Sequence, residues 1–308
     1  GHQKNASDQE PAGTLPFVCS LQDMGKPSSS SSFSFFLCAS LMVLSFCSVP
    51  GAKSQEVEDE KEFSYVVGSP NGPERWGDLH EEWALCKNGD MQSPVDLTHE
   101  RVEVVPGMGR MKRSYKPAYA TLKNRGHDIM LEWTGDAGSI QIDGTEYHLK
   151  QCHWHSPSEH SINGKRFAME VHLVHQSSEN KTAVLGIMYK RGRPETFLSE
   201  LMEPIESIAK SKDEKREIGV VDPRHIKLGS RKYYRYLGSL TTPPCHQGVV
   251  WTITRKVRTV SMEQVRLLRE AVHDDARENA RPQQALNEGA LHFYRPLTKT
   301  YHDEHPHR

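Results

Sequence analysis

Residues 145–155 read TEYHLKQCHWH, and this stretch constrains the fold more than any other part of the 308-residue chain. Successive side chains of a β-strand point to opposite faces. One face should therefore carry Tyr147, Leu149, Gln151, His153 and His155, and the other His148, Lys150, Cys152 and Trp154. Two strand steps separate the β-carbons of His153 and His155 by roughly 6.5 to 7 Å. At this separation two imidazoles can bind the same metal ion.

A second strand pattern follows at residues 166–176. One face should carry Ala168, Glu170, His172 and Val174, and the other Phe167, Met169, Val171, Leu173 and His175. The connection SINGK, residues 161–165, has the Asn and Gly typical of tight turns. If the two strands are antiparallel neighbours, His172 lies across from the histidine pair and the site has three nitrogen ligands.

Three neutral nitrogens leave one tetrahedral position open, which is typical of catalytic rather than structural zinc. The alternative is that these are polar strand residues in a histidine-rich protein, because 17 histidines give about one His-x-His pair by chance. A second pair, His305 and His307, lies in a polar tail without apolar alternation. The spacing alone leaves both interpretations open.

Composition indicates an ordinary soluble protein that can bury one sizeable core. Charged residues make up 26% and hydrophobic residues 36%, with a net charge of −1 and a pI near 7.1. This balance favours no nucleic-acid partner and no strongly cationic one.

The N-terminal region predicts targeting to the secretory pathway. Residues 24–52 are interpreted as a signal peptide, with a basic start after Met24, an apolar stretch from Phe33 to Val49 and small residues near Ala52. The stretch is short of the roughly twenty residues that a membrane span needs, although a retained anchor is the alternative. Residues 1–23 are expected to be an upstream extension, and residues 297–308 a disordered tail. The expected location is extracellular.

Removing the leader leaves Cys86, Cys152 and Cys245, an odd number for an oxidising compartment. Cys152 lies in the histidine strand and is interpreted as a buried free thiol, so the favoured disulfide joins Cys86 to Cys245. Asn180-Lys-Thr182 is a glycosylation acceptor motif, and an unused motif is equally compatible with the sequence.

The rest of the chain predicts one predominantly β domain over residues 63–296. Short strands are expected at residues 120–133, 139–142, 182–189 and 248–254. Helical spacing occurs at residues 197–210 and 261–273, the second with Ser261 and Glu263 in capping positions. These two helices should be peripheral.

Seven ordered blocks resemble the alpha-class carbonic anhydrases, most closely the plant branch. They are NGPERW (71–76), QSPVD (92–96), NRGH (124–127), the two histidine strands, AVLGI (183–187), YLGSLTTPPC (236–245) and RP (281–282). The resemblance implies a mainly β, single-domain fold with a central twisted, mostly antiparallel ten-stranded sheet and a few peripheral helices.

The resemblance also implies site roles. His153, His155 and His172 would bind Zn²⁺, while Thr241 and Glu159 would orient the attacking hydroxide. Gln151 and Glu170 would fix the ligand rings, and His127 would relay protons to solvent. The apolar wall that holds carbon dioxide would consist of Val174, Val184, Leu240, Thr242, Val249 and Trp251.

The implied reaction is the reversible hydration of carbon dioxide to bicarbonate. The alternative is a storage or interaction protein on the same fold with weak or no activity, since the plant branch includes tuber storage proteins in which a zinc ligand is replaced. The three histidines with Thr241 and Glu159 favour the enzyme, and no His-Glu-x-x-His motif supports another zinc hydrolase. We expect a small-molecule substrate, no nucleic acid and no stable membrane span; the sequence sets no oligomeric state. For a member of the plant branch, the expected extracellular location is the apoplast, with a plastid reached through the secretory route as the alternative.

Overall fold

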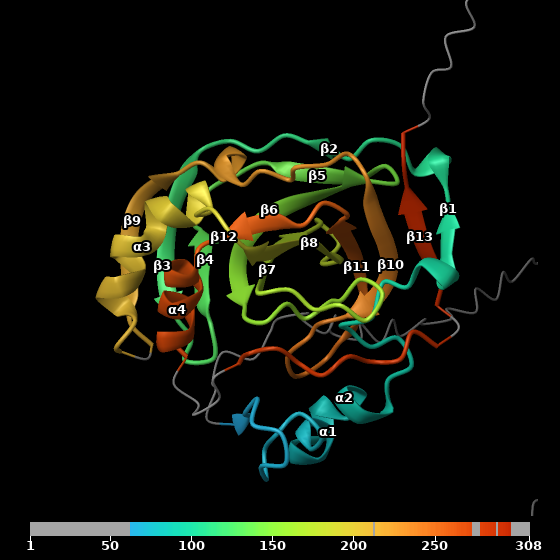
Figure 1. The fold of residues 1–308 in the computed structure, drawn as a ribbon, viewed down its shortest axis with the longest axis horizontal. Coiled ribbons are helices and arrows are strands. Elements are labelled where there is room, and N and C mark those ends of the chain that lie inside the picture. The colour runs from blue at the N-terminus through green and yellow to red at the C-terminus, as the bar shows by residue number, and fades with distance from the viewer. Residues whose placement is uncertain (1–61, 212, 273–277, 288, 297–308) are drawn as a thin grey trace, which may run out of the picture. The chain divides into compact units, whose positions relative to one another are not determined.

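The structure, a computed structural model, describes residues 62–211, 213–272, 278–287 and 289–296 (Figure 1). The predicted signal peptide, upstream extension and C-terminal tail lie outside these residues. Within them, no helix is both long and apolar enough to cross a membrane.

The described residues form one 13-stranded sheet, of which ten strands follow a continuous path. The path is β1 (Val102–Val104), β13 (Leu291–Tyr294), β10 (Tyr233–Ser239), β11 (Gln247–Thr254), β8 (Thr182–Arg191), β7 (Met169–Gln176), β6 (Thr145–His155), β4 (Ile129–Trp133), β3 (Ala118–Asn124) and β9 (Lys215–Val221). Three strands attach beside it: β2 (Lys112–Arg113), β5 (Ser139–Ile142) and β12 (Arg258–Val260). Pairing is antiparallel except at β1–β13, β8–β11 and β8–β12, which confirms the predicted sheet.

Two of the helices match the predicted pair. α3 (Thr196–Ile208) packs against β3, β9 and α4 (Met262–Glu270) (Figure 1). Ser261 and Gln264 form the capping box of α4, so the residue three positions into the helix is Gln264 rather than the predicted Glu263. The described chain also contains α1 (Trp76–Leu79), α2 (Leu85–Asn88) and the 3₁₀ turns η2 (Glu81–Trp83), η3 (His99–Arg101), η4 (Pro106–Met108) and η5 (Pro223–His225), all too short to show a period.

Two predicted strands have different bounds. Residues 120–133 form β3 and β4 instead of one strand, because the chain reverses at residues 125–128, where Gly126 has φ +83° and Arg125 N–H donates to Asp128 O. The strand expected from residue 166 begins at Met169. Phe167, expected on the face of Val171, packs instead with the cluster around Trp251.

One extra residue in β6 overturns the predicted face of Tyr147 and Leu149. Leu149 pairs with His175 and Gln151 pairs with Val174, so Lys150 is a bulge without a partner on β7. A one-residue slip moves side chains to the other face. Tyr147 and Leu149 therefore join the same apolar core as Cys152 and Trp154, opposite to His153 and His155.

The sheet separates two apolar clusters. The larger one holds Cys152, Trp154, Val171 and Leu173 with the buried face of α3, and the other contains Trp251 and Leu240. The disulfide joins Cys86 to Cys245, 159 residues apart, and Cys152 is free and buried, as predicted. Phe63, Trp76 and Trp83 pack around the disulfide.

Candidate metal centre

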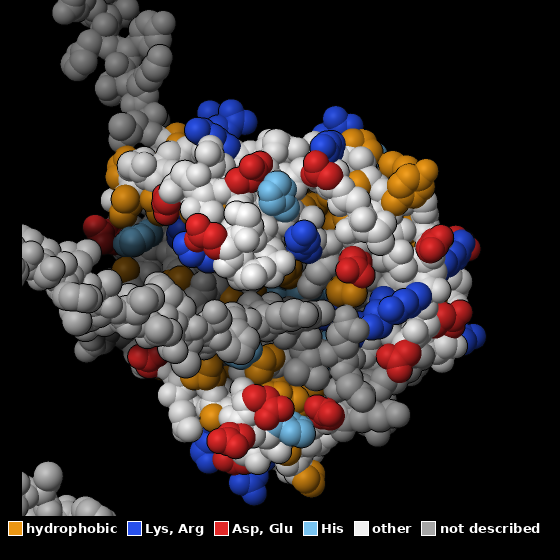
Figure 2. All heavy atoms as spheres, turned by 180° about the vertical axis from the view of Figure 1, so that it is seen from behind, with side chains coloured by type: hydrophobic (Ala, Val, Ile, Leu, Met, Phe, Trp, Pro, Cys, Tyr) orange, Lys and Arg blue, Asp and Glu red, His pale blue; other side chains and the backbone are white. Residues whose placement is uncertain are grey.

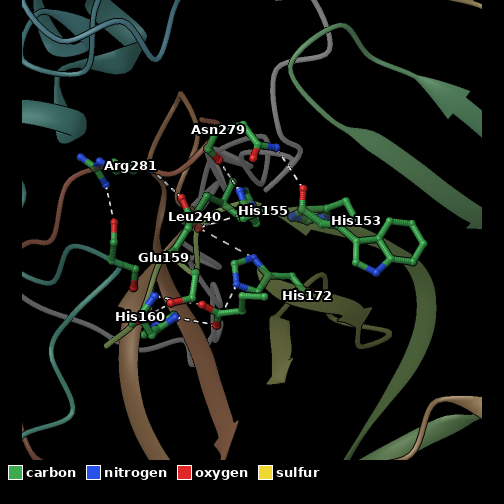
Figure 3. A network of polar contacts seen from close by, with 12 residues as sticks. His153, His155, Glu159, His160, His172, Leu240, Asn279 and Arg281 are labelled. Carbon is green, nitrogen blue, oxygen red and sulfur yellow. Dashed lines mark hydrogen bonds and ion pairs between the residues drawn. The ribbon is translucent and has the colours of Figure 1, made fainter. Parts of the chain in front are cut away.

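Three histidine rings meet between β6 and β7. His153 pairs directly with His172, and His155 with Glu170, so the antiparallel pairing predicted from the sequence is correct. Ring centroids of His155 and His172 are 4.6 Å apart, and those of His153 lie 5.0 and 5.3 Å from them. All three residues are buried, with one ring nitrogen from each lying within 4.8 Å of the others (Figure 3).

Hydrogen bonds fix which nitrogen of two rings carries the proton. His153 Nδ1 lies 2.9 Å from Gln151 Oε1, and His155 Nδ1 lies 2.6 Å from the Asn279 carbonyl oxygen. Both oxygens can only accept, so each Nδ1 donates. The Nε2 lone pairs of His153 and His155 are then available to a metal ion.

The third ring is turned the other way. His172 Nε2 lies 3.1 Å from Glu170 Oε1, so its Nδ1 is the nitrogen available for a ligand. Glu159 Oε2 lies 3.8 Å from this Nδ1 and 3.6 Å from His155 Nε2. The two nitrogens therefore face the same small region, and His155 Nε2 has no hydrogen-bond partner among the described residues.

The donor set fits zinc, because a ligating imidazole must be neutral. Burial lowers the pKa of His172 to about 4 and holds that of His153 well below its usual value. Both rings are thus uncharged at neutral pH. Three imidazole lone pairs whose opposite nitrogens face oxygen atoms match the arrangement of catalytic zinc sites.

Glu170 anchors a buried chain of polar groups behind His172. Its carboxylate accepts the backbone N–H of His160 at 2.9 Å and contacts His160 Nδ1 at 2.8 Å. His160 Nε2 lies 2.7 Å from the Tyr236 hydroxyl, which lies 2.9 Å from Ser93 Oγ. Burial opposes ionisation of Glu170, but His160 and His172 outweigh it and hold the carboxyl's pKa well below its usual value.

A glycine makes room for this carboxylate. Gly186 on β8 pairs with His172 on β7. A β-carbon on Gly186 would lie 2.8 Å from Glu170 Oε1 and 2.6 Å from Ile253 Cδ1. Any larger residue would therefore displace Glu170 from the imidazole that it contacts.

Glu159 is held on its other side by the C-terminal segment. Its Oε1 accepts the Arg281 backbone N–H at 2.9 Å, and the Arg281 guanidinium donates to Gln92 Oε1, Ser93 O and Cys86 O. Oε2 accepts no hydrogen bond from the described residues, so the expected contact with the Thr241 hydroxyl is not formed. Thr241 is buried, in the loop that follows β10.

The residues expected to form the apolar wall mostly lie together. One buried cluster contains Val184, Leu240, Val249 and Trp251, and the half-buried Val174 packs against it. The Trp251 ring lies 4.8 Å from the His172 ring and 4.9 Å from the His160 ring. Thr242, the residue after Thr241, is also buried. The metal centre thus has an apolar side.

Residues 71–294 match the family model of the eukaryotic-type carbonic anhydrases, and this match covers most of the chain. The chain belongs to the alpha carbonic anhydrase family. Alpha carbonic anhydrase 7 of Arabidopsis thaliana is 53% identical over 264 residues, which are 85% of this chain and 96% of that protein.

Two dioscorins and a bacterial alpha carbonic anhydrase are also similar to this chain. Dioscorin DB3L of Dioscorea polystachya is 46% identical over 90% of this chain and 99% of its own length. The crystal structure of a dioscorin complexed with ascorbate aligns with a TM-score of 0.75 at 45% identity, covering 77% of this chain and 99% of that one. The structure of the alpha carbonic anhydrase of Thermovibrio ammonificans in complex with sulfanilamide aligns with a TM-score of 0.68 at 33% identity. The alignment covers 75% of this chain and 98% of that one.

His127, the expected proton relay of this family member, lies in the turn between β3 and β4. It is 1% exposed, with its ring 5.1 Å from the Phe63 ring and its Nε2 3.9 Å from Asp128 Oδ2. Asp128 forms a buried pair with Arg125, whose Nε donates at 2.8 Å. Burial opposes ionisation of Asp128, but the guanidinium outweighs it and lowers the carboxyl's pKa.

Sequence reasoning missed two residues of the centre, Asn279 and His160. The Asn279 side chain accepts Ser156 N–H and donates to the carbonyl oxygens of His127 and Trp154. A signal for Asn279 was its place two residues before the RP block, but its partners lie more than 120 residues away. His160 lies five residues after the last residue of the histidine strand and was visible only as one more histidine.

Proposed function

We propose that this chain is a zinc-dependent carbonic anhydrase that reversibly hydrates carbon dioxide to bicarbonate and a proton. The observation that carries the proposal is the set of three buried ring nitrogens within 4.8 Å of one another, with the opposite nitrogens facing Gln151, Asn279 and Glu170. Bound zinc would acidify water so that hydroxide is available at neutral pH, a behaviour already established for carbonic anhydrases.

The protein's own groups then prepare the reaction. Gln151, the Asn279 carbonyl and Glu170 fix the rings and raise their basicity, which favours tight metal binding. Glu159, held by the Arg281 N–H, keeps Oε2 directed at the centre. We propose that Thr241 donates its hydroxyl proton to this oxygen in the zinc-loaded protein and so orients the nucleophile. The apolar wall beside His172 suits carbon dioxide, which has no charge to solvate.

His127 is proposed to carry the released proton away from the centre. An imidazole can exchange protons near neutral pH. Because the ring is buried against Phe63, exchange with bulk water requires the ring or the neighbouring chain to move. If His127 is the relay, His127→Ala should slow turnover at low buffer concentration, and added imidazole should restore it. Equal turnover without imidazole would remove His127 from the mechanism.

The test of the proposed function combines zinc stoichiometry on the purified protein with stopped-flow carbon dioxide hydration. We expect one zinc per chain and hydration that an aromatic sulfonamide abolishes. Zinc-loaded protein without turnover would contradict the enzymatic proposal. It would favour the second candidate, a storage or interaction protein, which the similarity to dioscorins supports.

We also propose that the protein matures in the secretory pathway. The disulfide between Cys86 and Cys245 supports this, since such bonds persist in oxidising compartments. Asn180 is exposed in the turn between β7 and β8, where an oligosaccharide could be attached. The mass of the protein secreted from plant cells, before and after deglycosylation, tests both points. A protein retained in the cytosol with unmodified Asn180 would contradict them.

A further inference from the structure

A basic cavity lies away from the histidine cluster, on the side of the sheet where β2 approaches β10. It has a volume of about 1050 Å³ and is bounded by residues 110–113, 227–231, Tyr233 and Thr254. Its cationic lining residues are Arg110, Lys112, Arg113, Lys227 and Arg231, and none of the described residues that line it is Asp or Glu. The chain as a whole has a net charge of −1, but the described lining of this cavity is strongly basic.

Three of these cations have no partner among the described residues. Arg110, Lys112 and Arg231 are exposed, and their side chains make no hydrogen bond or ion pair with any other described residue. Arg113 is partly engaged, because it donates to Ile226 O and lies over the Tyr115 ring. Lys227 donates to Arg224 O. The cavity thus presents cationic groups that internal contacts do not satisfy.

Several surface cations elsewhere are paired with acids. Lys87 pairs with Asp78, Lys116 with Asp136 and Lys181 with Glu179, each at 2.6 to 2.7 Å. On the face in Figure 2, acidic and basic side chains are interspersed. Asp143, in the turn after β5, acts electrostatically on Tyr233 but does not line the cavity. Unpaired like charges in one cavity repel one another and favour an anionic ligand.

More basic residues lie behind the cavity. A β-carbon on Gly229 would lie 3.3 Å from Arg258 Nη1 and 3.3 Å from Lys256 Cδ. Lys256 lies between β11 and β12, and Arg258 is the first residue of β12, so three separate segments of the chain bring cations to this place. The floor is partly apolar, because Met111 and Leu228 are half-buried and pack on the larger core cluster.

The lining decides between classes of anion. Tyr233 is buried and its hydroxyl donates to Gly109 O, so no lining aromatic ring is exposed for a nucleobase to stack on. None of the exposed large apolar residues lines the cavity, which disfavours insertion into a lipid surface. No helix begins among the lining residues, so the backbone cradle typical of a single phosphate is also missing there.

We propose that this cavity binds an acidic polysaccharide, a chain of sugar rings that carry carboxylate or sulfate groups. Arg110 and Lys112 on one wall and Arg231 on the other would pair with successive anionic groups, as guanidinium and ammonium groups do with oxyanions. The sugar rings would lie over Met111, Leu228 and the aliphatic stems of the basic side chains.

The test uses the folded, secreted protein and fluorescent oligosaccharides in an anisotropy titration. Oligogalacturonate supplies carboxylates without sulfates and dextran sulfate fragments supply sulfates without carboxylates, so the two arms identify the anionic group. Fully methyl-esterified oligogalacturonate is the uncharged control. We expect binding to the charged chains that weakens as salt is raised, and none to the ester. Equal binding of the ester, or salt-independent binding, would overturn the proposal.

A matched pair of triple variants locates the site. Arg110→Ala/Lys112→Ala/Arg231→Ala should weaken binding by at least about tenfold, because three exposed charge contacts are lost. Lys87→Ala/Lys116→Ala/Lys181→Ala removes as many charges from ion-paired positions and should leave binding unchanged. Equal losses in both triples would show a diffuse charge effect and reject the cavity. Duplex DNA, inorganic triphosphate or phosphatidylserine vesicles binding as tightly as the sugars would reject the polysaccharide assignment.

Discussion

The two faces of β7 carry histidines that differ in what their nitrogens contact. His175 points into the larger core, where Nε2 lies 2.6 Å from the Tyr115 hydroxyl and Nδ1 lies 3.2 Å from Ala183 O. His172, three residues earlier on the other face, has one nitrogen beside Glu170 and the other directed towards His155 and Glu159. Burial lowers the pKa of both. Burial and titration therefore do not identify a ligand; the direction of the second nitrogen does.

The largest effect should come from substituting His172, the histidine of this pair that faces the candidate metal centre. His172→Ala removes one of three nitrogen ligands and should lower zinc affinity and hydration by more than the roughly 10- to 100-fold cost of losing an outer partner. His175→Gln is the control, because its amide can replace Nε2 beside the Tyr115 hydroxyl and the residue faces away from the candidate metal centre. Zinc content and stopped-flow rates measure the difference. A His172→Ala protein with full zinc and normal hydration would disprove the ligand assignment.

The next effect concerns stability on the core face. Leu173 is fully buried between His172 and Val174 in sequence, whereas Val174 is half-buried on the metal side. Leu173→Ala should lower the free energy of unfolding by about 2 to 5 kcal/mol and leave zinc stoichiometry intact. Val174→Ala should cost less because part of its surface is already exposed. Urea unfolding measures both, and equal losses would contradict the division between the faces.

Glu170 tests how far the orientation of His172 depends on a carboxylate. Glu170→Gln keeps the shape but removes the charge beside His172 Nε2, so zinc affinity should fall by about 10- to 100-fold. Competition with a chelator measures this affinity. Gln141→Glu, a change of similar size at an exposed position of β5, provides the control. Unchanged affinity in Glu170→Gln would show that the histidine is oriented by packing alone.

The smallest effect is a pH dependence of the core histidine. Burial lowers the pKa of His175 from 6.5 to about 3. Between these pH values the unfolded chain binds a proton at His175 and the folded chain does not. Stability contributed by neutral His175 is therefore present above pH 6.5 and lost as pH falls toward 3.

The size of this loss can be isolated by substitution. Zinc-free wild type should lose about 2 kcal/mol more than zinc-free His175→Gln between pH 7 and pH 5. Denaturant unfolding at the two pH values measures it. Parallel stability curves would mean that His175 is accessible to protons in the folded state.

Much of the fold and the ligand triad follows from local pattern. The alternation in residues 145–155 and 166–176, with a turn between them, predicted His172 opposite the histidine pair if the strands are antiparallel neighbours, and His172 does pair with His153. The pairing of Cys86 with Cys245 followed from counting cysteines once Cys152 was assigned to a buried strand. The strand pairing and the disulfide could be predicted because the strand period and the number of cysteines can be read from the sequence without knowing any distant contact.

Other features depend on contacts that no local pattern records. The bulge at Lys150 changes the face of Leu149, and strict alternation cannot reveal it. The partners of Asn279 lie at residues 127, 154, 155 and 156. The enclosure of His127 by Phe63 also joins segments far apart in the chain. Sequence reasoning therefore found the three candidate ligands and two residues beside their rings, Gln151 and Glu170, but neither Asn279 nor His160.

Asn279 has a consequence for how the protein is made. Its carbonyl oxygen holds the His155 ring from 124 positions further along the polypeptide. A nascent chain on the ribosome in which Asn279 has not yet been added lacks the carbonyl group that sets the His155 tautomer. Metal loading should accordingly be a late event that follows synthesis of the C-terminal segment, and ribosome-bound chains stalled before residue 279 should capture little zinc.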